Sequence, residues 1–147
     1  LPLAQEAAGG VPEVVQRRVL RALQHPAVNI LGHPTGRLLG QREPFAIDLD
    51  AVIAAAREHD VALEINADPA RLDLDDRWAR SAAHAGVPVT INTDAHAPEG
   101  FDHLRHGVLQ ARRAWLTPDD VINAWELARL RRFLAKEPGW RDDGPEA

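Results

Sequence analysis

The sequence predicts an α/β fold in which parallel strands alternate with helices. Three short apolar runs, at residues 28–32, 61–65 and 87–92, have the length of buried strands and lead into polar residues. Segments with apolar residues at helical spacing lie between and around these runs. Strands that alternate with helices pair in parallel, in an open sheet or in a barrel.

The predicted helices carry recognisable start and stop signals. Pro12 lies near the start of the first one, and Asp48 has the character of an N-cap for the second. Gly86 is a C-terminal stop for the third, and Thr117 followed by a proline and two acids is a helix start. In chain order, we expect helix 11–24, strand 28–32, helix 48–59, strand 61–65, helix 75–85, strand 87–92, helix 102–113 and a helix that begins at residue 117.

Polar residues share one face of the predicted strands. Residues of one parity are apolar in the runs 61–65 and 87–92, which suits packing against helices. The other parity carries Glu64 and Asn66 in one strand, and Thr90 and Asn92 in the next. A sheet covered by helices on both faces is apolar on both. The polar face therefore favours a barrel whose mouth holds a site.

Length and composition set the limits of the prediction. The 147 residues correspond to one domain, with 45% hydrophobic and 27% charged residues. We expect a flexible segment at 1–10, the folded part at 11–136 and a frayed tail at 137–147. Because the chain begins at Leu1 and contains no methionine, we also expect it to be part of a longer protein.

Several function classes are disfavoured by composition. A net charge of −5 argues against a broad basic face that clamps a nucleic-acid duplex. The absence of cysteine rules out disulfides, zinc–thiolate sites and thiol chemistry. Since no apolar stretch approaches about 20 residues, we expect a cytoplasmic protein that does not bind membranes.

Candidate metal ligands follow two of the predicted strands. Asp94 and His96 are two residues apart after the third strand, so in extended backbone their side chains point to the same side. His33 follows the first strand. Carboxylate and imidazole together suit Mn²⁺, Zn²⁺ or Fe²⁺. The alternative for Asp94 and His96 is a solvated turn.

Two arginines are candidates for binding a phosphate group. Arg37 follows His33 on a short glycine-containing loop, and its fork of donors matches phosphate oxygens. A structural ion pair is the alternative for Arg37, and for Arg71 the two interpretations are about equal. We expect Arg129, with its neighbours Arg131 and Arg132, to form a solvated helix end.

Five ordered motifs carry a family resemblance over about residues 11–134. The chain resembles the latter half of a PHP (polymerase and histidinol phosphatase) domain, of the type attached to bacterial family-X DNA polymerases. The motifs are Gly-His-Pro-Thr-Gly-Arg (32–37), Glu-Ile-Asn-Ala (64–67), Arg-Leu-Asp-Leu (71–74), Thr-Asp-Ala-His (93–96) and Ala-Arg-Arg-Ala-Trp-Leu (111–116).

The resemblance implies a distorted (β/α)7 barrel with a trinuclear metal centre at its C-terminal mouth. It implies phosphoester hydrolysis, namely 3′-5′ exonuclease and related DNA end processing in repair, with Mn²⁺ as the expected metal. Carried over by position, His33, Asp94 and His96 match metal ligands. Glu64 and Asn66 match a strand-end motif without being ligands, and we expect them to contact substrate. Arg37 would stabilise the charge of the transition state, and Arg71 would bind substrate.

The chain also departs from the family pattern. The family's His-x-His signature is missing, because no two histidines are two residues apart. We therefore expect the C-terminal half of a PHP domain, with about a third of the metal ligands and no activity on its own. Its expected partners are a DNA 3′ end, the missing N-terminal half or the polymerase domains, and a second copy through an open strand edge. The alternatives are a histidinol-phosphate-type phosphomonoesterase and a non-catalytic structural or docking PHP domain.

Overall fold

A computed structural model describes residues 3–142, with side chains from Glu13 onward. The helices and strands are α1 (Leu3–Leu23), β1 (Ile30–Leu31), α2 (Leu49–Glu58), β2 (Ala62–Asn66), α3 (Asp76–His84), β3 (Val89–Asn92), α4 (Leu104–Arg113) and α5 (Leu127–Leu134). Three short 3-10 helices, η1 (Pro98–His103), η2 (Pro118–Asp120) and η3 (Ile122–Ala124), complete the chain.

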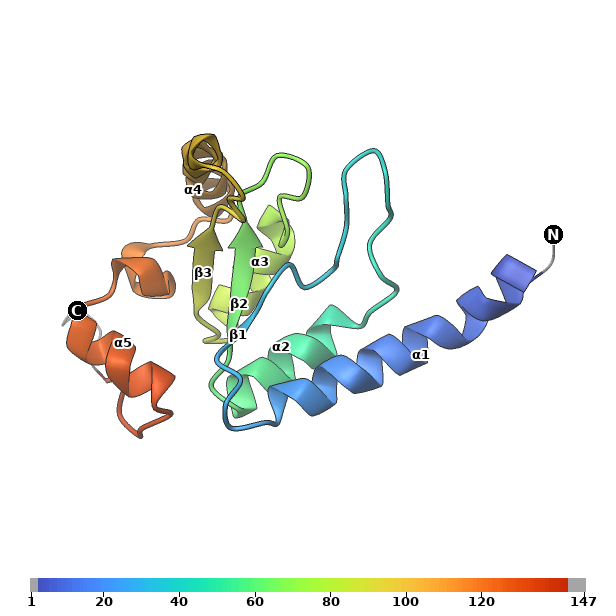
Figure 1. Cartoon of the computed structure of the whole chain (residues 1–147). Helices are drawn as coiled ribbons and strands as arrows, with labels where there is room; N and C mark the ends of the chain where they lie inside the picture. Colours follow the sequence, from blue (N-terminus) through green and yellow to red (C-terminus); the bar gives the residue numbers. More distant parts are fainter. Residues whose placement is uncertain (1–2, 143–147) are drawn as a thin grey trace.

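The three strands form one parallel sheet in the order β1-β2-β3, as Figure 1 shows. Leu31 pairs with Leu63, and Ile65 pairs with Ile91. Neighbours in the sequence are thus neighbours in the sheet, and helices separate them. This confirms the predicted parallel α/β arrangement. It is also the strand order of a barrel, although a closed (β/α)7 barrel stays a prediction.

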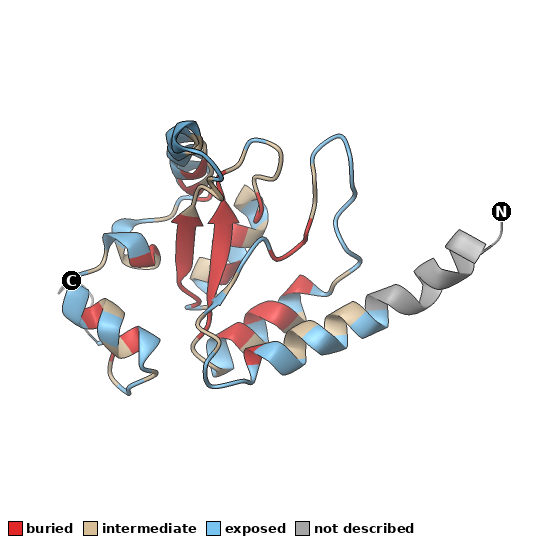
Figure 2. Ribbon diagram, in the orientation of Figure 1, coloured by how far each residue is buried: buried red, intermediate tan, exposed pale blue. Residues whose placement is uncertain are grey.

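Helices α2, α3 and α4 pack against the apolar face of the sheet. All five residues of β2 are buried, and Figure 2 shows β2 and β3 as the buried centre of the molecule. Val52 and Ile53 from α2 pack into the same core as Leu63 and Ile65. By register, Glu64 lies beside Thr90 on the opposite face. The predicted separation of an apolar and a polar face is therefore confirmed.

Helix starts follow the sequence signals closely. The Asp48 carboxylate accepts from the Ala51 amide at 3.1 Å, and the Asp75 carboxylate accepts from the Trp78 amide at 2.9 Å. Both aspartates therefore satisfy amides that the first helical turn leaves unpaired. The predicted N-cap Asp48 is confirmed, and Asp75, predicted as the first residue of the third helix, is its N-cap.

Several element boundaries differ from the prediction, and the strand predicted at 28–32 is reduced to β1, Ile30–Leu31. Residues 3–10, predicted as a flexible segment, belong to α1. The helix predicted at 102–113 begins as the 3-10 helix η1 and becomes α4 only at Leu104. The capping box at Thr117 is present but starts only η2. The chain then leaves the helix because Val121 forms a parallel bridge with Val89 of β3.

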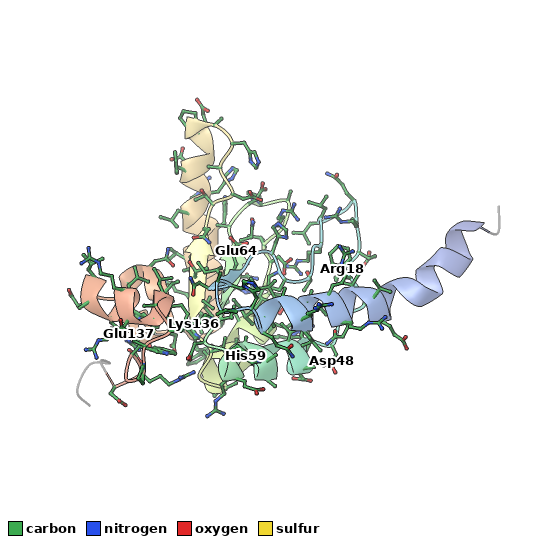
Figure 3. The ribbon with its side chains drawn as sticks, turned by 60° about the horizontal axis from the view of Figure 1, so that its bottom comes forward. Arg18, Asp48, His59, Glu64, Lys136 and Glu137 are labelled. Carbon is green, nitrogen blue, oxygen red and sulfur yellow. The ribbon has the colours of Figure 1, made fainter. Side chains whose placement is uncertain are left out.

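The C-terminal segment packs onto the body instead of fraying from residue 137. Trp140 is 3% exposed and meets Phe133 in an edge-to-face contact, with ring centroids 4.9 Å apart. Lys136 donates through Nζ to the His59 carbonyl at 2.6 Å, and Figure 3 labels both residues. The rest of the predicted tail, residues 143–147, lies outside the described residues.

Arg129 is a second correction in this segment. We predicted a solvated helix end, but Arg129 is buried. Its guanidinium lies 3.8 Å from the centre of the Trp125 ring and forms an ion pair with Asp119. A buried guanidinium needs such partners, because an unpaired buried charge is costly.

No helix within residues 3–142 is sufficiently long and apolar to cross a membrane.

Candidate active site at the strand ends

Glu64 connects the carboxyl ends of all three strands. Glu64 is 8% exposed and lies on the polar face of β2, and Figure 3 labels it near the centre of the view. Oε2 accepts from the His33 amide, just after β1, at 2.6 Å. Oε1 accepts from Asn92 Nδ2, at the end of β3, at 2.9 Å. The strand register brings these groups together because parallel strands end at the same edge of a sheet.

Asp94 lies in the same polar network. Its Oδ2 accepts from Asn66 Nδ2 at 3.1 Å and forms an ion pair with Arg71 Nε at 3.4 Å. Asn66 Nδ2 also lies 3.4 Å from Glu64 Oε2, so the amide bridges two carboxylates. The Arg71 side chain is 18% exposed and that of Asp94 31%. The structure therefore joins Glu64, Asn66, Asp94 and Arg71, which we had singled out from sequence.

His96 has a ring orientation suited to a metal ligand. Its Nδ1 lies 2.7 Å from the Asp94 carbonyl oxygen, which can only accept, so Nδ1 carries the proton. In the neutral ring the lone pair is then on Nε2, and the side chain is exposed. A hydrogen bond to the other ring nitrogen is the usual way in which proteins orient a metal-binding histidine.

The backbone at two candidate ligands has a left-handed conformation. φ is +28° at His33 and +55° at Asp94. Residues other than glycine adopt such values uncommonly and at an energetic cost, and they concentrate at functional sites. At both positions the chain turns sharply just past the sheet.

The described residues fit a metal ion only in part. His96 Nε2 and the Asp94 carboxylate have the right chemistry for a divalent cation. Among the side chains that the structure describes, from Glu13 to Asp142, however, no three His, Asp or Glu groups are arranged to hold one ion. The roles of His33, Asp94 and His96 as ligands therefore stay predictions, and further ligands would have to come from elsewhere.

The Arg37 guanidinium binds the loop that contains Arg71 and Leu72. Its Nε donates to the Arg71 carbonyl at 2.8 Å, and its Nη2 donates to the Leu72 carbonyl. In return, Arg71 Nη1 lies 3.4 Å from the Arg37 carbonyl. Arg37 thus fixes the segment that carries Arg71, while Arg71 is the cation beside Asp94. The predicted contact of Arg37 with a phosphate group has no support in these bonds.

Asp73 is an important residue of this region to which the sequence analysis gave no role. It belongs to the quoted Arg-Leu-Asp-Leu motif and is fully buried. Its Oδ2 accepts from the amides of Thr35 and Gly36, each at 3.0 Å. The loop after His33 is thereby fastened to the loop that carries Arg71. An aspartate in the middle of a motif, without its partner in view, does not reveal this contact.

Burial raises the pKa of Asp73 above its ordinary value of 3.8. Hydrogen bonds from Thr35 and Gly36, and the charge of Arg37, oppose this effect. The folded state therefore holds the proton more tightly than the unfolded state. The stabilising contribution of this group is complete below pH 3.8 and is lost as the pH rises through the folded-state pKa.

Asp73→Asn should remove this pH dependence. Asparagine keeps an acceptor oxygen but does not ionise, so the variant should gain stability relative to the native chain as pH rises above 3.8. Urea unfolding of both proteins from pH 3.5 to pH 7 gives the difference between their free energies of unfolding. The other titratable groups are the same in both proteins, so their contributions cancel in this difference. A difference that stays constant or moves in favour of the native chain would contradict the raised pKa.

Comparison with known proteins gives relatives of two named kinds. The DNA polymerase/3′-5′ exonuclease PolX of Bacillus subtilis is 43% identical over 123 residues, which make up 84% of this chain and 22% of that protein. A probable phosphatase of Thermoanaerobacter sp. is 24% identical over 127 residues, 82% of this chain and 49% of that protein. A probable phosphatase of Clostridium acetobutylicum is 32% identical over 93 residues, 59% of this chain and 36% of that protein. No family model matches the chain.

The chain resembles the C-terminal part of a PHP domain. Its similarity to the Bacillus polymerase confirms the resemblance to the branch attached to family-X DNA polymerases. The chain spans about a fifth of that protein and about half of the Thermoanaerobacter phosphatase. The activities in their names belong to those longer proteins.

Proposed function

We propose that this chain is part of a metal-dependent phosphoesterase of the PHP family that removes nucleotides from DNA 3′ ends. The observation that carries the proposal is Asp94, held by Asn66 and paired with Arg71 at the carboxyl end of a parallel sheet. Active sites of α/β folds lie at that end of the strands. The 43% identity to a polymerase and 3′-5′ exonuclease favours DNA as substrate.

Each side chain has a distinct proposed task. Asp94, His96 and His33 would each contribute a ligand to a metal centre that polypeptide outside this chain completes, with Mn²⁺ expected and Zn²⁺ or Fe²⁺ as alternatives. When bound, such an ion lowers the pKa of a water molecule and offsets the charge on phosphate. Arg71 would bind a phosphate oxygen, since its guanidinium is partly exposed beside Asp94. Arg37 would keep Arg71 in place through the Arg71 and Leu72 carbonyls.

Further ligands would come from polypeptide outside this chain. We propose the N-terminal half of a PHP domain as the partner, in the same protein or as a separate one. β1 lies at an edge of the sheet, and Ile30 on it is 39% exposed. An unpaired strand edge tends to pair with another chain. Pairing of two copies through β1 is the competing outcome.

A chimera tests the proposed function. In it, this chain replaces the matched 123 residues of the Bacillus polymerase. We expect Mn²⁺-dependent release of nucleotides from a DNA 3′ end by the chimera, and very little by the 147-residue chain alone. A folded chimera without hydrolytic activity on any phosphoester would contradict the proposal. Full activity of the isolated chain would show that it needs no partner.

Two alternative functions give different outcomes. Two relatives are named probable phosphatases, which supports a phosphatase as the first alternative. A histidinol-phosphate-type phosphomonoesterase would hydrolyse a free phosphomonoester and leave DNA intact. A structural or docking PHP domain would hydrolyse neither substrate, even with Mn²⁺ and all its partners. Assaying both substrates side by side therefore distinguishes all three functions.

Arg71→Ala should weaken substrate binding. A hydrogen bond to a charged group contributes about 1.5–3 kcal/mol, so we expect KM for the DNA substrate to rise roughly 10- to 100-fold in the chimera. The matched control is Arg77→Ala, because the Arg77 side chain is 85% exposed and its ion pair is with Asp75, not with Asp94. Steady-state kinetics give both values. If Arg71→Ala and Arg77→Ala behave alike, Arg71 does not bind substrate.

A further inference from the structure

Glu64 is buried, and its carboxylate oxygens accept hydrogen bonds from other groups of the protein. Oε2 accepts from the His33 amide at 2.6 Å and lies 3.4 Å from Asn66 Nδ2. Oε1 accepts from Asn92 Nδ2 at 2.9 Å. A buried carboxylate is retained only with such partners, because an unpaired one is costly. From sequence we expected Glu64 to contact substrate, but these hydrogen bonds indicate that its carboxylate binds other parts of the protein.

The partners of Glu64 belong to the groups whose placement the proposed function requires. His33 is a candidate ligand, and the hydrogen bond that its backbone amide donates to Glu64 connects the loop after β1 to the middle of the sheet. Asn66 donates through the same Nδ2 to Asp94 Oδ2 at 3.1 Å. Glu64 therefore contacts both His33, which is 31 residues away in the sequence, and the Asn66 amide that binds Asp94.

β1 gives the His33 loop little support of its own. It contains only Ile30 and Leu31, and it pairs with β2 on one side. The backbone at His33 is in the left-handed region, at φ +28°, which costs energy unless the surroundings hold it. Two side chains hold this loop from outside, since Glu64 binds the His33 amide and Asp73 binds the next two amides.

We propose that Glu64 is a positioning residue, whose buried carboxylate sets the His33 loop and the Asp94 carboxylate relative to each other. The inference rests on the proposed function in one respect, since it treats His33 and Asp94 as members of one metal site. Glu64 itself touches neither metal nor substrate. Such supporting residues are worth about 10- to 100-fold in metal affinity when they are lost.

Hydrogen exchange of the 147-residue chain tests the positioning role without any metal. In Glu64→Ala, the His33 amide should exchange about 10- to 100-fold faster, the change that corresponds to one lost hydrogen bond to a charged group. In Glu64→Gln, an acceptor oxygen remains, so protection should stay close to that of the native chain. Glu126→Ala is the matched control, because Glu126 is exposed on the far C-terminal segment.

A third variant covers the case in which Glu64→Ala does not fold. Glu64→Asp keeps the charge but draws the oxygens back by one methylene, so the His33 amide should again lose protection. Equal protection of the His33 amide in the native chain and in every folded variant would overturn the proposal.

Mn²⁺ titration of the same proteins separates a positioning residue from a ligand. We expect Glu64→Ala to bind Mn²⁺ about 10- to 100-fold more weakly and Glu64→Gln to bind nearly as well as the native chain. A loss in Glu64→Gln as large as in Glu64→Ala would make Glu64 a ligand and overturn the positioning role. If the native chain binds no Mn²⁺, the metal role in the proposed function loses support, while hydrogen exchange still decides the role of Glu64.

Discussion

Asp94→Asn should lower Mn²⁺-dependent phosphoester hydrolysis by more than about 100-fold. Asparagine has nearly the same shape and can still accept from Asn66, but it has no charge for a metal ion or for Arg71. Loss of a supporting residue costs about 10- to 100-fold in metal affinity or activity, and loss of a direct ligand should exceed that. Rates of nucleotide release by the chimera, together with its manganese content, measure the effect.

Asp102→Asn is the matched control for this change. Asp102 is exposed on η1, a few residues further along the same polypeptide, and its replacement should leave the rate unchanged. Thermal unfolding of both variants shows whether a lost activity reflects a lost fold. Asp94→Asn with more than a tenth of the native rate would remove Asp94 from the metal site.

Phe133→Ala should destabilise the chain by about 3–5 kcal/mol, the usual cost of removing a fully buried aromatic side chain. Phe133 is 0% exposed and packs edge-to-face against Trp125 and Trp140, at 5.7 and 4.9 Å between ring centroids. Such ring pairs contribute beyond the buried area alone. Urea unfolding of the 147-residue chain measures the loss.

Phe101→Ala is the control for the aromatic change, because Phe101 is 69% exposed and should alter stability little. The loss at Phe133 should also free the segment after α5. Trp140 Nε1 donates to Asp60 Oδ1 at 3.1 Å, so its fluorescence should shift toward that of a solvated indole. Equal stability of the two alanine variants would show that the C-terminal cluster does not support the fold.

The sequence by itself determined those features of this chain that depend only on neighbouring residues. Asp48 and Asp75 are N-caps because a carboxylate reaches amides three residues ahead, whatever lies around it. The alternation of Leu63 and Ile65 with Glu64 is set by the pleat of a strand and gave the two faces correctly. The five motifs identified the family before any contact was known.

Only the tertiary structure decided which polar groups meet. Arg71 forms an ion pair with Asp94. Arg37, the more obvious phosphate ligand in the sequence, instead donates hydrogen bonds to two backbone carbonyls. Arg129 and Trp140 are buried by packing on the body, although their local sequence is that of a charged helix end and a Pro/Gly-rich tail. A pattern in the sequence describes a residue and its near neighbours. Partners 30 residues away depend on strand register and on the left-handed turns after β1 and β3, which the packed fold alone fixes.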